Sequence, residues 1–292
     1  MLNRMLKTAV AALVAVSLMS CGGGGVVHGV DLAITDAPLD LASSVNISFS
    51  QVQLRGPNVT PFTVNISPAS SIDVYSLQGG IASTIISAMQ VEPGHYTNLR
   101  ITIASDPNSL QSNITLPDGL HILYLAPGVS SQVNIPVDFH IASGGDLTLT
   151  MDFDLRKSII QDPNDPTKYQ LIPSIRAVEN QFSGAITGSV ATSLITCLAP
   201  AVYVYSGDVT PTDVDITAPP SRVQPISTAL VGFNQTTSAY NFTVGFLPAG
   251  DYTVAFTCEA QLDVANQSNT LTFTSIGHAT VQPLNTTFIT LQ

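Results

Sequence analysis

Apolar and polar residues alternate with a period of two in several short runs along the chain. The clearest run extends from Leu147 to Arg156, where every second residue is apolar and the residues between are Thr, Asp or Arg. Successive side chains of a β-strand point to opposite faces, so this run predicts a strand with one apolar and one polar face. The same period predicts further strands over 45–49, 99–103, 133–141, 240–246 and 252–258.

Two segments modify this pattern. Pro136 interrupts the run 133–141, and because proline has no backbone N–H, this strand is expected at a sheet edge or with a bulge. Residues 81–89 carry apolar residues at helical spacing, after a pair of glycines and before a proline, which predicts one short helix.

A similar turn sequence occurs twice, as EPGHYTNLRI over 92–101 and as PAGDYTVAF over 248–256. The glycine permits the positive φ of a tight turn. The following tyrosine, Tyr96 or Tyr252, is expected to pack on a sandwich end while its hydroxyl reaches the backbone. The second copy joins two alternating runs and predicts a hairpin with apolar inner faces.

The composition supports an all-β fold. Apolar residues make up 45% of the chain, which excludes wholesale disorder, and Val, Ile, Thr, Phe and Tyr recur between Pro, Gly and Asn. The sequence changes character near residues 180–184, where GAITGSV opens a new series of runs. We therefore expect two tandem β-sandwich domains, over 27–180 and 183–292.

The first twenty residues predict a cleaved secretory signal. Arg4 and Lys7 precede twelve apolar or small residues, too few for a bilayer-spanning helix, which needs about 20. The ending LMSC resembles the bacterial lipobox, in which the cysteine becomes the acylated first residue. This resemblance implies a palmitate-type lipid anchor on Cys21, a flexible glycine-rich tether over 21–26 and a place in the bacterial cell envelope, at the outer membrane. A plain secretory signal with an incidental cysteine is the alternative.

Longer stretches also resemble known families. The phrases VDLAITDAP, VEPGHYTNLRITI, LTLTMDFDLRKSI and LIPSIRAV, in this order within 30–178, resemble a domain of unknown function found in bacterial lipoproteins, family 4382. The resemblance carries over no activity. Residues 183–292, from GAITGSV to FLPAGDYTVAF, resemble the transthyretin-like or carboxypeptidase-regulatory-like β-sandwich, which implies a fold and no function.

Charge and motifs exclude several functions. Removal of Arg4 and Lys7 leaves 9 − 2 = 7 basic against 20 acidic residues, a net charge near −13 that disfavours nucleic acid. The chain contains no HExxH, Gly-x-Ser-x-Gly, GxGxxG or P-loop motif. We therefore predict no enzymatic activity and no cofactor.

Three aspartates allow two interpretations. Asp152 and Asp154 lie two apart on the polar face of the predicted strand, at a spacing that suits glycosidase chemistry or calcium binding. The simpler interpretation is a solvated strand face whose charge Arg156 balances, with Asp36 capping a turn before Pro38. A three-acid site with Asp36 is the alternative, but we predict no metal and no calcium-dependent stabilisation.

The remaining cysteines predict a disulfide. Cys258 falls on the apolar face of its strand, Cys197 lies beside the first strand of the same domain, and the envelope is oxidising. Two free buried thiols are the alternative.

Three functions are consistent with these features. The first is a non-enzymatic, lipid-anchored envelope protein that binds or scaffolds an envelope protein or a carbohydrate through its loops. The second is a carbohydrate-processing hydrolase or metal-binding domain that uses Asp36, Asp152 and Asp154. The third is an accessory subunit of a surface or export machine.

Overall fold

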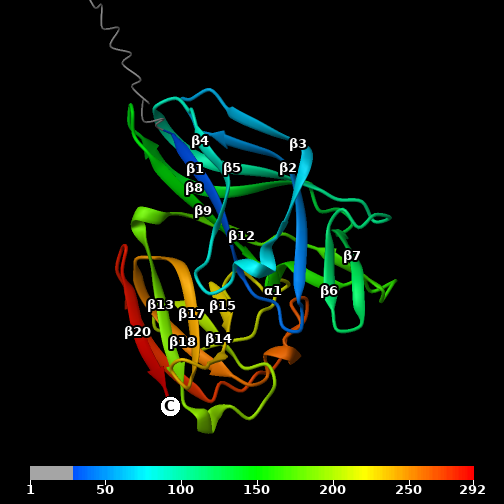
Figure 1. Ribbon diagram of the computed structural model, residues 1–292, viewed down its shortest axis with the longest axis vertical. Helices are drawn as coiled ribbons and strands as arrows, with labels where there is room; N and C mark the ends of the chain where they lie inside the picture. The colour runs from blue at the N-terminus through cyan, green and yellow to red at the C-terminus, as the bar shows by residue number, and fades with distance from the viewer. Residues whose placement is uncertain (1–28) are drawn as a thin grey trace, which may run out of the picture.

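The computed structural model describes residues 29–292, so the predicted signal peptide and Cys21 lie outside the described residues. The predicted all-β class is confirmed. The only α-helix in the described part is the single turn α1 (Leu155–Ser158), and strands form four sheets. No sheet combines strands from before and after the 3-10 turn Asn180–Phe182. We call the two units the N-terminal sandwich and the C-terminal sandwich (Figure 1).

The N-terminal sandwich pairs two sheets. Sheet A has the order β12 (Ile175–Glu179), β9 (Leu147–Asp154), β1 (Val30–Ala37) and β4 (Ser83–Met89). Sheet B has the order β10 (Ile159–Gln161), β11 (Lys168–Leu171), β7 (Gly119–Leu125), β6 (Asn113–Leu116), β2 (Ser44–Arg55), β5 (Gly94–Ala104) and β8 (Gln132–Ile141), with β3 (Phe62–Asp73) on β2. The alternating apolar side chains of β1 and β9 form one buried core with those of sheet B.

The structure corrects one predicted element of this unit and confirms another. Residues 81–89 do not form a helix, because 83–89 is the edge strand β4, antiparallel to β1. Pairing with β1 buries Met89 and half-buries Ile85 and Ile86. The apolar residues that suggested a helix are therefore removed from water by the strand instead. The strand that contains Pro136 lies at the edge of sheet B, as predicted, and its register shifts opposite Pro136.

The C-terminal sandwich also pairs two sheets. Sheet C has the order β16 (Gly232–Asn234), β17 (Ala239–Pro248), β13 (Ser183–Val190) and β20 (Thr286–Leu291). Sheet D has the order β15 (Ser227–Leu230), β14 (Ala201–Ser206), β18 (Gly250–Thr257) and β19 (Ser275–Val281). The predicted disulfide is confirmed: Cys197 and Cys258 are bonded, with Cα atoms 5.5 Å apart.

The two tyrosine turns are arches between sheets. In the first, Tyr96 donates to the Glu92 carbonyl at 2.8 Å, and in the second, Tyr252 donates to the Pro248 carbonyl at 2.7 Å, which confirms the predicted role of both hydroxyls. The predicted hairpin is wrong, because β17 pairs within sheet C and β18 within sheet D. Alternation cannot distinguish strands that pair side by side from strands that face each other across a core.

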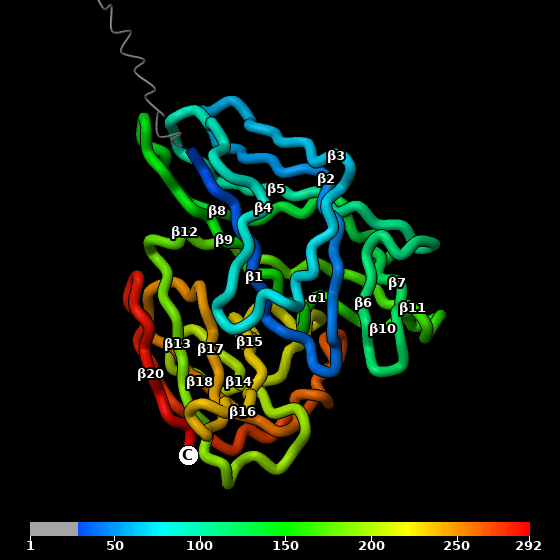
Figure 2. The backbone as a smooth tube through the Cα atoms, in the orientation of Figure 1, coloured from blue at the N-terminus to red at the C-terminus, as the bar shows by residue number. Residues whose placement is uncertain are grey.

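The sandwiches are stacked along the longest axis of the molecule. β1 starts at the upper end and runs down to the junction, while sheets C and D occupy the lower end (Figures 1 and 2). At the junction the backbones approach closely at two glycines. A Cβ atom on Gly245 of β17 would lie only 2.7 Å from the Cα atom of Gly80. The sandwiches therefore meet through a tight contact that has no room for a side chain.

Candidate functional site

The two aspartates of the predicted polar face are buried, so their assignment to a solvated surface is wrong. Asp152 is 3% exposed and Asp154 is 5% exposed. Both belong to the outer face of sheet A, at the end of β9 where the C-terminal sandwich covers it. Periodicity assigns residues to a face, but a second domain decides whether that face meets water.

Asp36 does not share this face. The parallel register of β1 and β9 pairs Asp36 with Phe153, whereas Thr35 pairs with Asp152. Residues paired in this way project to the same side of a sheet, so Asp36 follows the core face and the other two acids follow the outer face. Within residues 29–292 no three His, Cys, Asp or Glu side chains are placed to hold a metal ion.

The carboxyl of Asp36 is the most isolated acid in the described chain segment. It is 7% exposed, and neither oxygen has a hydrogen bond of good geometry, although the nearby backbone of Leu155 lowers its pKa. Burial raises the pKa of Asp36 well above its usual value, and the charges of Asp152 and Asp154 raise this pKa further. Burial also raises the pKa of Asp152, although Arg176 counteracts the shift.

Three basic residues of the N-terminal sandwich bridge to the C-terminal sandwich in the same way. Each one pairs with an aspartate of its own sandwich and also donates to a backbone carbonyl of the other. The three bridges are Asp40–Arg156–Ala260, Asp154–Lys157–Pro225 and Asp152–Arg176–Phe246. We call this set the junction bridges. A charge-assisted hydrogen bond to a carbonyl is about twice as strong as a neutral one, so the set fixes the contact between the sandwiches.

Arg156 is the most buried basic residue of the junction bridges. Its side chain is 1% exposed, and its Nη1 atom lies 2.6 Å from Asp40 and 3.0 Å from the Ala260 carbonyl. Its Nε atom donates weakly to Thr228 at 3.4 Å, and its guanidinium lies 5.3 Å from the ring centre of Tyr203. Asp40 and α1 position Arg156 from one side, and sheet D positions it from the other.

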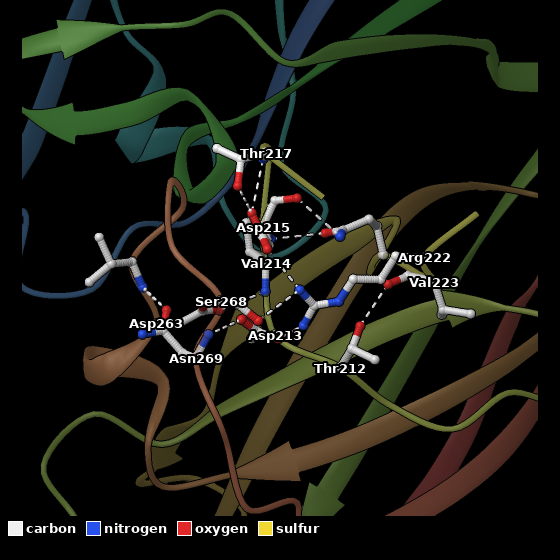
Figure 3. A network of polar contacts seen from close by, with 12 residues as sticks. Thr212, Asp213, Val214, Asp215, Thr217, Arg222, Val223, Asp263, Ser268 and Asn269 are labelled. Atoms are coloured by element: carbon white, nitrogen blue, oxygen red, sulfur yellow. Dashed lines mark hydrogen bonds and ion pairs between the residues drawn. The ribbon is translucent and has the colours of Figure 1, made fainter. Parts of the chain in front are cut away.

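The polar contacts continue into the loops of the C-terminal sandwich. The Tyr203 hydroxyl donates to Asp263 at 2.7 Å, and the same carboxylate oxygen accepts from the backbone of Val214 at 3.2 Å. Next along this loop, Arg222 pairs with Asp213 and, at 2.8 Å, with Asp215 (Figure 3). The network ties the loops 207–226 and 258–274 to the outer face of sheet D, where they cover a small second core.

The space around the acids is small. Asp36 and Asp152 line a cavity of about 10 Å³, which is room for about one water molecule. A separate cleft of about 170 Å³ is lined by Asp152, Asp154, Lys157 and Arg176. Both carboxylates of this cleft already have a basic partner, so the shifted pKa of Asp152 accompanies a structural ion pair.

The sequence interpretation missed most of the junction. It noted Arg156 only as a charge that balances a solvated face, and it did not single out Asp40, Lys157 or Arg176. Asp40 lies 116 residues before Arg156, and no spacing rule connects residues so far apart. The scarcity of basic residues was the available signal, because three of the seven Lys and Arg residues after residue 28 lie here.

Asp36 predicts a pH dependence of stability. Its native pKa is raised, so the native state holds a proton at pH values where the unfolded carboxyl, with a pKa of about 3.9, has lost it. The free energy of unfolding contributed by this group should therefore be greatest at low pH and decline as pH rises through the native pKa. Asp36→Asn should remove this decline and stabilise the protein relative to wild type at the alkaline end.

Urea unfolding of both proteins across pH 4.5 to 8.5, a range of about four units, measures this difference. Asp106→Asn is the matched control, because Asp106 is exposed and an asparagine oxygen can still accept from the backbone N–H of Asn108. A stability difference between Asp36→Asn and wild type that is constant over the whole range would contradict the prediction.

No helix within residues 29–292 is both long and apolar enough to cross a membrane.

Comparison with known families finds a match within the N-terminal sandwich. Residues 29–173 match the family described as "Domain of unknown function (DUF4382)", which confirms the resemblance found in the sequence. The match covers just under half of the chain and includes β1, β9 and the acids Asp36, Asp152 and Asp154. No curated protein matches the sequence.

The chain has weak similarity to solved structures of three bacterial proteins. The Bacillus anthracis TIE protein is 10% identical, with a TM-score of 0.19, and the match covers 90% of this chain and 34% of the TIE protein. The chain thus spans about a third of that protein's length. The minor pilin GBS52 of Streptococcus agalactiae is 11% identical, with a TM-score of 0.20, and the match covers 89% of this chain and 93% of the pilin. The major pilin of Streptococcus pyogenes is 11% identical, with a TM-score of 0.20, and the match covers 90% of this chain and 96% of the pilin. TM-scores this low carry no argument about function.

Proposed function

We propose that this protein is a non-enzymatic, lipid-anchored protein of the bacterial cell envelope, at the outer membrane. Its role is binding or scaffolding, with the two sandwiches acting as one rigid arm. The N-terminal sandwich is the unit nearer the membrane, and the C-terminal sandwich, which we assign to residues 183–292, is presented at the far end. The lipid on Cys21 and the tether over 21–26 supply the attachment.

The junction bridges are the observation that carries this proposal. A hinge between domains is usually built from loops that absorb changes in φ and ψ, with few contacts across it. Here three charged side chains each bind both sandwiches, and the Gly80–Gly245 contact leaves no room for a side chain. Since β1 begins at the end remote from the C-terminal sandwich, a rigid junction holds that sandwich away from the anchored end (Figure 1).

Spin-label distances test the rigid arm. Gln132 on β8 and Thr290 on β20 are exposed and lie in different sandwiches, so Gln132→Cys and Thr290→Cys place one label on each in a soluble Cys21→Ser chain. We expect one narrow distance distribution. Adding Gly245→Val, which forces a side chain against Gly80, should broaden it. A broad distribution before that change would contradict the rigid arm.

The lipid anchor gives a second prediction. Cys21→Ser should move the protein from the membrane fraction to the soluble fraction and abolish its labelling by a fatty-acid analogue. Two or more acyl chains are needed for stable anchoring, and the reaction that adds them requires the cysteine thiol. Met19→Ala, which changes the lipobox-like ending but keeps the thiol, is the control. Unchanged labelling of Cys21→Ser would refute the anchor.

The hydrolase or metal-binding alternative finds less support. Its three acids lie on two faces of sheet A, and each is at least nine-tenths buried. The ion pairs of Asp154 with Lys157 and of Asp152 with Arg176 favour a structural part for these two acids, since the cleft that they line also contains both basic partners.

A further inference from the structure

The outer edge of β12 has free backbone groups. Within residues 29–292, sheet A ends at this strand, and β9 is the one strand that pairs with it. The backbone N–H of Asp154 donates to the Ser174 carbonyl at 3.0 Å, and in an antiparallel ladder hydrogen-bonded and non-bonded pairs alternate. Arg176 and Val178 therefore bond to β9, whereas the N–H and C=O groups of Ile175, Ala177 and Glu179 point away from the sheet.

An apolar groove runs along this edge. It has a volume of about 190 Å³ and lies between β12 and β8, with Val137, Phe139, Leu149 and Ala177 among its lining. Phe182, which follows β12 in the chain, also lines the groove although it is 58% exposed. A free strand edge and an apolar pocket beside it are the two elements that strand addition uses, the first for affinity and the second for side-chain selection.

The neighbouring edge is more strongly protected than this one, whose charged side chains are Arg176 and, at the last position of the strand, Glu179. β8 carries Pro136, which has no N–H to offer, and the exposed charge of Asp138. The one basic side chain of β12, Arg176, is held by Asp152 and by the Phe246 carbonyl and so cannot guard the edge. Natural sheets usually block such an edge, so a weakly protected one next to an apolar groove indicates a contact site.

We propose that the edge of β12 accepts one extended segment of a partner protein as an added strand, and that this segment alternates apolar with basic residues. The free amides require an extended backbone, and the groove takes an aliphatic side chain. Asp138 and Glu179 line the groove; Asp138 contacts His95 and Glu179 accepts from Gln181, so no Lys or Arg in the described part neutralises either of them. Because the chain also has 20 acidic and only 9 basic residues, a basic segment is favoured and a second acidic copy is not. This proposal rests on the binding role proposed above and specifies its site.

A defined peptide tests the site. The probe is a capped seven-residue peptide of alternating Lys and Val, added to the soluble Cys21→Ser chain, and the readout is amide hydrogen exchange by NMR. We expect binding with a Kd of about 1 mM or tighter, weakened by salt. Exchange should slow at Ala177 and Glu179 but not at Arg176 and Val178, which are already bonded. The same peptide with Glu in place of Lys should bind more weakly.

Two variants make the test specific. Ala177→Pro removes the central outward N–H without touching the ladder to β9 and should weaken binding about fivefold to tenfold. Phe182→Ser should also weaken it, and this exposed position serves if the proline variant does not fold. Phe233→Ser, at a half-exposed phenylalanine on β16, is the control and should bind like wild type.

Several outcomes would overturn the proposal. These are no binding at about 1 mM peptide, equal binding by the Phe182→Ser variant, or protection of the same amides without peptide through self-association. Failure here leaves the anchor and the rigid arm untouched, because labelling of Cys21 and the spin-label distances do not depend on this edge.

Discussion

Arg156→Met should lower the free energy of unfolding by about 3–5 kcal/mol. The change leaves the Asp40 carboxylate buried without its counter-charge, since Asp40 is only 6% exposed and its other oxygen has no partner. It also removes the donor to the Ala260 carbonyl, which links the sandwiches. Breaking one half of a buried ion pair costs more than the pair itself contributes, because the remaining charge stays away from water.

Urea unfolding with a two-state fit measures the loss, and two further variants identify its cause. Arg156→Met combined with Asp40→Leu removes both charges and should recover most of the lost stability, as replacements of whole buried pairs commonly do. Arg100→Met removes a surface arginine that contacts only neutral amides and should stay within about 0.5 kcal/mol of wild type. An equal loss in the single and the double variant would show that the charge of Asp40 is not the cause.

Removing the disulfide is the second large change. The double substitution Cys197→Ala and Cys258→Ala removes a cross-link between residues 61 positions apart. In the chain-entropy model this loss lowers the free energy of unfolding by about 4 kcal/mol. Cys258 directly follows β18, and Ala260, the acceptor of Arg156, lies two residues further. The bond therefore also holds the segment on which one junction bridge depends.

Calorimetry of the double alanine variant tests this expectation. We expect the melting temperature to fall. Loss of the bond also loosens the segment that carries one junction bridge, so the two sandwiches should unfold in two separate steps. Val204→Ala, a truncation in the core of the same sandwich, is the control that should destabilise without opening the closure. A loss below about 1 kcal/mol would show that the unfolded chain gains little freedom when the bond is absent.

The sequence was sufficient for local features that depend on neighbouring residues. Alternation located β9, the edge position of β8 followed from Pro136, and the backbone hydrogen bonds of the Tyr96 and Tyr252 hydroxyls followed from a repeated turn phrase. Each of these depends on the backbone chemistry of a few adjacent residues. The bonded cysteines could be predicted because only two remained after Cys21 and one of them lay on a core face.

Features that depend on distant residues could not be predicted in this way. Residues 83–89 form a strand because β1 is available to pair with them, and β17 and β18 separate because each finds a partner in its own sheet. The acids Asp152 and Asp154 are buried because a second sandwich covers them, at positions that a solitary sandwich would leave in water. The candidate site arises from this covering, so its residues look like ordinary surface charges in the sequence.

The junction bridges also affect where a protease can cleave the protein. Trypsin cuts after lysine and arginine, and of the seven such residues after residue 28, Arg156, Lys157 and Arg176 are occupied in the junction. Four remain, at Arg55, Arg100, Lys168 and Arg222, and Arg222 is itself held by two aspartates. A chain with so few accessible cleavage points is difficult to digest at the surface of a cell. New fragments ending at 156, 157 or 176 would then report directly that the two sandwiches have come apart.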